Sequence, residues 1–136
     1  MLHTTNYINT LIEPAEDSPH LRPVVPKPNQ GKTTIATFQY DLLHRQAYHL
    51  TSDELLFRVH ALRNGLDVQD IKALELFFSK PQACLRTSPL TKKFGWAIHA
   101  DSQGRIALID VASPAYQALQ TDPKVKKVKA MRSKRR

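Results

Sequence analysis

Two strand-like runs joined by a four-residue turn constrain this chain more than any other feature. Residues 94–100 and 105–111 flank the turn Asp101-Ser102-Gln103-Gly104, and a glycine at its fourth position suits a type I turn closed by a left-handed residue. Pairing Asp101 with Arg105 gathers the larger apolar side chains on one face, namely Trp96, Ile98, Ala100, Ile106 and Leu108. A slip by one residue would scatter them. We therefore predict this register, with Trp96 and Ile98 buried and His99 on the opposite face.

Helices are predicted from apolar periodicity and from capping residues. The clearest signal is a capping box at Thr51 and Glu54, ahead of an apolar-periodic run that Gly65 ends. Asp67 is predicted to cap the helix that follows. An apolar-periodic run over residues 32–45 indicates a third helix, and Ser113 followed by Pro114 indicates the start of a fourth. The four predicted helices cover residues 32–45, 52–64, 68–80 and 114–120.

The fold class that follows is α+β, an antiparallel sheet of three or four strands with helices packed mainly on one face. Further strands are expected within residues 4–14 and, as an edge strand guarded by lysines, within 124–131. Five of the nine prolines lie in residues 14–31, which we name the Pro-rich loop. The second face of the hairpin carries alanine and isoleucine side chains too apolar for open water. We expect the Pro-rich loop or a partner subunit to cover part of it.

The net charge of +8 is concentrated near the C-terminus. From Lys124 onward eight residues are basic and none is acidic, which leaves 12 basic and 12 acidic residues in the rest of the chain. We predict one globular domain over residues 1–131 and a disordered basic tail over 132–136. We expect eight cationic residues to contact nucleic acid or an acidic protein: Lys124, Lys126, Lys127, Lys129, Arg132, Lys134, Arg135 and Arg136.

Several segments spread along the chain match a known pattern. The most specific are TSDELLF at 51–57, FFSKPQACLRTSPLTKKFGW at 77–96 and VKKVKAMRSKR at 125–135. With them, the chain resembles a family of small bacterial proteins of unknown function. The resemblance implies a single complete cytoplasmic domain whose basic tail is native. It implies no activity, ligand or catalytic residue.

A carboxylate between an imidazole and a guanidinium would suit a small site on the second hairpin face. The predicted register puts His99, Asp101 and Arg105 together there. His99 and Asp101 would form an acid–base pair, and Arg86 or Arg105 would hold an anionic group. The same residues also suit turn scaffolding, because cross-strand Asp–Arg pairs commonly flank turns. Both interpretations stay open at this point.

Other motifs favour ordinary structural roles. Cys84 would be a nucleophile if Lys80, Arg86 or His99 stabilised its thiolate, but a lone cysteine is more often a small buried hydrophobe. The Gly-Lys-Thr sequence at 31–33 lacks the glycine that a phosphate-binding loop needs five residues earlier. The six histidines do not follow metal-ligand spacing, so we predict neither a metal site nor a cofactor.

These observations lead to two functional hypotheses. The first is a small cytoplasmic binding module whose cationic tail contacts nucleic acid or an acidic partner. A single cysteine favours a reducing compartment, and no apolar run approaches the roughly 20 residues of a membrane span. The second is an enzyme or small-ligand receptor. Its pocket would lie between the Pro-rich loop and the hairpin face that carries His99, Asp101 and Arg105.

Overall fold

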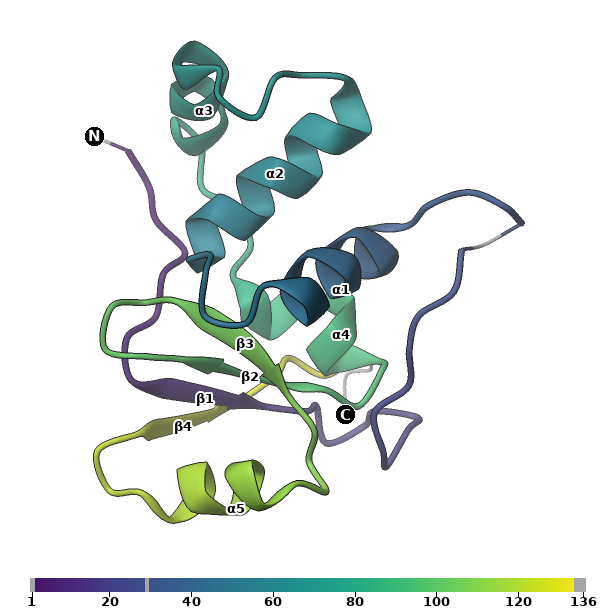
Figure 1. Cartoon of the computed structure of the whole chain (residues 1–136), viewed down its shortest axis with the longest axis vertical. Coiled ribbons are helices and arrows are strands. Elements are labelled where there is room, and N and C mark those ends of the chain that lie inside the picture. Colours follow the sequence, from purple (N-terminus) through teal and green to yellow (C-terminus); the bar gives the residue numbers. More distant parts are fainter. Residues whose placement is uncertain (1, 29, 134–136) are drawn as a thin grey trace.

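A four-stranded sheet in the order β3-β2-β1-β4 forms the centre of the molecule (Figure 1). The computed structural model describes residues 2–28 and 30–133. Strand β1 (Thr10–Glu13) pairs antiparallel with β2 (Ala97–Ala100) and parallel with β4 (Lys126–Lys129), and β2 pairs antiparallel with β3 (Ile106–Ile109). The sheet is thus mostly antiparallel, and the predicted α+β class is confirmed.

The β2–β3 hairpin has the predicted register. Ala100 lies opposite Ile106 and Ile98 opposite Leu108, and the turn is closed by a hydrogen bond from the Gly104 amide to the Asp101 carbonyl. Ile98 is fully buried, as predicted. Trp96 is only half-buried, which corrects the prediction. Its indole nitrogen donates to the Val24 carbonyl at 2.9 Å, so this edge of the ring lies against the Pro-rich loop.

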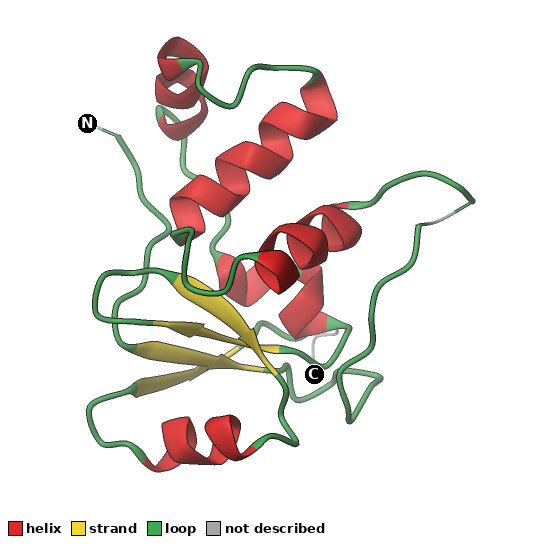
Figure 2. Cartoon of the chain, in the orientation of Figure 1, coloured by secondary structure: helices red, strands yellow, loops and turns green. Residues whose placement is uncertain are grey.

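Four α-helices and a 3-10 turn lie on one side of the sheet, and one helix lies on the other (Figure 2). The first group comprises α1 (Ile35–Arg45), α2 (Ser52–Asn64), α3 (Ile71–Phe78), η1 (Leu85–Thr87) and α4 (Pro89–Lys92); α5 (Pro114–Thr121) is the other. The predicted capping box at the start of α2 is present, and Gly65 ends that helix. Among the described residues, no helix is long and apolar enough to cross a membrane.

The start of α3 differs from the prediction. Its N-cap is Asp70, whose carboxylate accepts from the Ala73 amide at 3.1 Å. Asp67 instead forms a tight turn just before the helix, where its carboxylate accepts from the Gln69 amide and its carbonyl from the Asp70 amide. An aspartate can satisfy either kind of backbone donor, so the sequence pattern did not distinguish the two sites.

Helix α5, rather than the Pro-rich loop or a partner subunit, covers the second face of the hairpin. Its Tyr116 packs with Leu11, Ala97, Ala107 and Ile109 in a cluster that the main core does not share. This corrects our expectation for that face. The physical cause is the three-residue spacing of Tyr116 and Leu119, which puts both side chains on the face of α5 that packs in this cluster.

The Pro-rich loop runs along α4 and the start of β2. The Ala15 amide donates to the Thr91 carbonyl, and the Val24 amide donates to the Phe94 carbonyl, each at 2.9 Å. The loop therefore contributes to the side of the sheet that the larger group of helices covers. It does not form the predicted pocket with the second hairpin face.

The C-terminal end is held by acidic residues of the Pro-rich loop. Glu16 forms ion pairs with Lys129 and Arg132, and the Asp17 carboxylate accepts from the Ser133 amide at 2.9 Å. Residues 132 and 133, which make two of these contacts, belong to the predicted tail of 132–136. Residues 134–136 of that predicted tail lie outside the described residues.

Two glycines with left-handed backbone differ in what surrounds them. A Cβ added at Gly95 (φ 76°) would lie 2.6 Å from the carbonyl oxygen of Arg22, whereas at Gly65 (φ 65°) nothing lies within 4 Å. We expect Gly65→Ala to lower the free energy of unfolding by about 1 kcal/mol, the cost of a left-handed alanine. Gly95→Ala should cost at least about twice that, because the Pro-rich loop must also move. Urea denaturation measures both, and equal losses would contradict the close approach of the loop.

Candidate functional site

The predicted residues of the hairpin end do not form an acid–base pair. The Asp101 carboxylate accepts from the Gln103 and Arg105 amides, each at 2.9 Å, and so stabilises the turn. The His99 ring instead shares a hydrogen bond of 2.8 Å with the Tyr48 hydroxyl. Partial burial lowers the pKa of His99, and this outweighs the raising effect of the Asp101 charge. These contacts support turn scaffolding over catalysis.

Arg86 and Arg105 are not brought together. The Arg86 Nε donates to the Lys129 carbonyl at 2.7 Å, and the Arg86 carbonyl accepts from the Met131 amide at 2.8 Å. Arg86 thus lies at the end of β4, whereas Arg105 lies beside the β2–β3 turn, which the strand register places at the opposite end of the sheet. They cannot hold one small anion between them.

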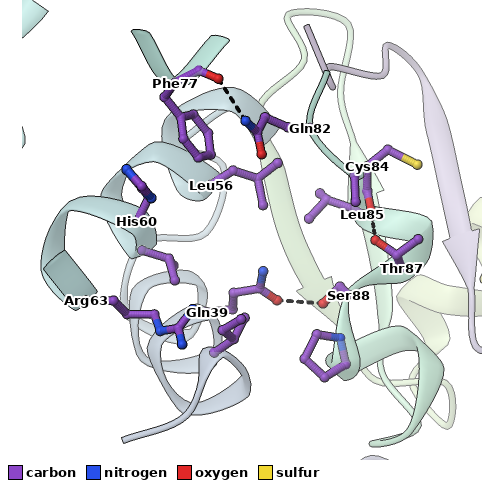
Figure 3. Close-up of a pocket in the computed structure, with 14 residues that line it drawn as sticks. Gln39, Leu56, His60, Arg63, Phe77, Gln82, Cys84, Leu85, Thr87 and Ser88 are labelled. Carbon is purple, nitrogen blue, oxygen red and sulfur yellow. Dashed lines mark hydrogen bonds between the residues drawn. The ribbon is translucent and has the colours of Figure 1, made fainter. Parts of the chain in front are cut away.

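Cys84 is half-buried and its sulfur is part of a polar contact. The Tyr7 hydroxyl donates to the Cys84 Sγ at 3.2 Å. Burial, and then the contact with Cys84, raise the pKa of Tyr7 to about 12. Cys84 also lines the pocket described below, but in Figure 3 its sulfur points away from that pocket.

Of the eight cationic residues predicted to contact a partner, five lie in the described part of the chain, and these five divide into two groups. Lys129 and Arg132 pair with Glu16, and the Lys127 ammonium donates to the Asp122 carbonyl. Lys124 and Lys126 are exposed, and within the described part of the chain their side chains have no acidic partner. Three more, Lys134, Arg135 and Arg136, lie outside the described residues.

A pocket of about 340 Å³ opens between α1, α2, the end of α3 and the segment 82–89 (Figure 3). The sequence analysis did not predict it. None of the proposed site residues His99, Asp101, Arg86 and Arg105 lines it. Much of its wall is apolar, contributed by Ile35, Leu56, Val59, Phe77, Leu85 and Pro89.

Gln39 supplies the most constrained polar group of the pocket. Its side chain is only 3% exposed, and its Oε1 accepts from the Ser88 hydroxyl at 2.6 Å. Ser88 caps α4, where its hydroxyl oxygen also accepts from the Leu90 amide. These contacts fix the orientation of the glutamine. Its amide nitrogen has no hydrogen-bond partner within the described chain and points into the pocket (Figure 3).

Two nitrogen-bearing side chains of α2, His60 and Arg63, lie on the same wall because they are three residues apart. The His60 ring packs against the Phe77 ring, with centroids 4.5 Å apart, and its Nδ1 lies 3.3 Å from the Asn64 amide nitrogen. The guanidinium of Arg63 forms neither a hydrogen bond nor an ion pair with any described residue. The sequence carried one signal of this wall, which was the i, i+3 spacing of His60 and Arg63.

The lining combines apolar surface with a few hydrogen-bonding groups. No aspartate or glutamate is among the residues that line this pocket. Among residues 2–28 and 30–133, no group of three or more His, Cys, Asp and Glu side chains could hold a metal ion. Such a combination of apolar wall and polar groups can position a small ligand.

The scaffolding role of Asp101 can be tested by the titration of His99. Asp101→Asn keeps a carbonyl oxygen for the two turn amides but removes the negative charge that raises the pKa of His99. We expect this pKa to fall further, with at most about 1 kcal/mol lost from the free energy of unfolding. NMR titration of the His99 ring, with Gln103→Ala as an uncharged control in the same turn, measures the shift. A rise in pKa would contradict the assigned contacts.

Comparison with known proteins gives a family but no function. No curated protein matches the chain, and no solved structure does. The family of unknown function DUF6157 matches residues 2–136, nearly the whole chain. This chain is therefore a member of the DUF6157 family.

Proposed function

We propose that this protein binds a small organic molecule in the pocket between α1, α2 and the segment 82–89. The observation that carries the proposal is the amide nitrogen of Gln39, which is directed into the pocket without a partner in the described chain. Among the described residues no side-chain nitrogen or oxygen is both fully buried and unpaired, so this nitrogen is open to the pocket. A ligand that accepts a hydrogen bond from it would take the place of solvent, and the buried position of the glutamine fixes where the acceptor must lie.

The size and lining of the pocket support a small ligand. Its volume of about 340 Å³ falls at the lower end of the range of roughly 300–1,000 Å³ for ligand sites. An apolar wall with a few convergent polar groups is the usual composition of such sites. The apolar wall would supply most of the affinity, and the polar groups would set the orientation.

A pocket-filling substitution tests the proposal. Ala83 is exposed and lines the pocket, so Ala83→Trp should fill it without disturbing the core. We expect fragments that shift the Gln39 side-chain amide resonance in NMR screening to bind the variant at least tenfold more weakly. Ala112→Trp, an exposed alanine before α5, is the matched control and should bind as the wild type does. A fragment library that never shifts the Gln39 resonance would overturn the proposal.

A second proposal concerns two exposed lysines at the start of β4. Lys124 and Lys126 have no acidic partner in the described chain, and we propose that they help to hold nucleic acid, in a reducing cytoplasm that also suits the unpaired Cys84. The pairing of Glu16 with Lys129 and Arg132 reduces the charge available nearby.

This second proposal predicts a strong dependence on salt. Affinity for a single-stranded oligonucleotide should fall steeply between 50 and 200 mM salt, roughly by a factor of ten or more. Lys124→Gln with Lys126→Gln should weaken it and flatten the salt dependence. Lys72→Gln with Lys80→Gln removes the same charge from exposed positions elsewhere and should change little. Fluorescence anisotropy measures all three, and equal effects of the two pairs would contradict a local role.

A further inference from the structure

We infer that the ligand of this pocket is an organic monocarboxylate, whose carboxylate meets Arg63 while its apolar part packs against α2 and the segment 82–89. The inference rests on the proposed function and specifies its ligand. It follows from three features of the pocket: the unpaired guanidinium, the directed amide of Gln39 and the absence of acidic side chains among the lining residues.

The first feature is Arg63, an exposed residue near the end of α2 that lines the pocket and has no counter-ion in the described chain. A guanidinium presents five N–H donors in a planar fork that matches the two oxygens of a carboxylate. The carboxylates of α2 itself, Asp53 and Glu54, lie in its first turn, roughly 10–15 Å along the helix axis from His60 and Arg63. They are engaged there, since Asp53 accepts from Thr5 and Glu54 accepts from the Thr51 amide.

The second feature is that the most constrained polar group that remains available in the pocket is a donor, the Gln39 amide nitrogen. The Ser88 and Thr87 hydroxyls already donate to Gln39 and to the Cys84 carbonyl. The Gln82 side-chain nitrogen donates to the Phe77 carbonyl at 2.8 Å, which leaves its oxygen as an acceptor. A ligand with an acceptor group that meets both Gln39 and Arg63 therefore suits the pocket.

The charge of the pocket selects a monoanion. Arg63 supplies one full positive charge, and the Gln39 amide is neutral. A carboxylate balances that charge, whereas a phosphate dianion would bring a second negative charge next to apolar walls without a second fixed cation. The volume of about 340 Å³ equals that of roughly eleven waters, which leaves room for an apolar body such as one ring.

Three probes of similar shape test the inference. Phenylacetate carries the carboxylate, phenylacetamide is its neutral counterpart, and phenyl phosphate carries the dianion. We expect phenylacetate to bind the wild type at least tenfold more tightly than either of the others, as followed by NMR titration of the Gln39 side-chain amide. In Arg63→Gln the ratio of the phenylacetamide Kd to the phenylacetate Kd should fall to about one. Arg58→Gln removes the same charge from α2 outside the pocket and should keep the wild-type ratio.

The outcomes separate this inference from the proposed function. Equal binding of phenylacetate and phenylacetamide at the Gln39 resonance would overturn the carboxylate but leave a small-molecule site. If phenyl phosphate binds more tightly than phenylacetate, the ligand is not a monoanion, but a small-molecule site remains. A fragment screen in which only neutral compounds bind would overturn the monocarboxylate in the same way. If neither the probes nor any fragment shifts the Gln39 resonance, both the inference and the proposed function are wrong.

Discussion

Strand β1 is buried on both of its faces, and the two layers of the molecule depend on it. Leu11 packs toward α5 and Ile12 packs toward the larger group of helices, and both are almost completely buried. Burial of such a side chain contributes roughly 1.5–3 kcal/mol. A strand of four residues can carry this role because it is paired on both edges, by β2 and by β4.

The lysine-rich strand β4 completes the sheet without adding much to its core. Val128 packs against the main cluster and Ala130 belongs to it, while Lys127 and Lys129 lie on the opposite face of the strand because side chains alternate. Lysines on an outer strand hinder pairing with another chain. Glu16 of the Pro-rich loop pairs with the end of this strand, so the loop and the C-terminal segment hold each other in place.

The pocket exists because α2 packs with two clusters at once. Its Leu55 and Val59 belong to the main core, whereas Phe57 and Ala61 join Phe78 in a smaller cluster with α3. The segment 82–89 returns from α3 to the sheet and leaves a space between the clusters. Small separate clusters have lower local stability than the main core. This places the candidate binding site beside the part of the fold that can adjust most easily.

Local chemistry in the sequence was enough to predict most elements of this fold, but not the short η1 and α4. The hairpin register followed from the segregation of apolar side chains and from Gly104, and the start of α2 followed from Thr51 and Glu54, because each signal acts between residues close in the chain. The half-burial of Trp96 was not predictable, since it depends on a carbonyl 72 residues away.

The candidate site was decided by tertiary structure alone. Gln39, Arg63 and Ser88 lie on three separate segments, and their spacing in the chain carries no sign that they meet. Conversely, His99 and Asp101 are close in sequence, yet the turn amides and Tyr48 engage them separately. The sequence determined which segments fold into helices and strands and which face of the hairpin is apolar. Only the packing of α2 between two clusters determined where a pocket opens, because that depends on long-range contacts rather than on neighbours in the chain.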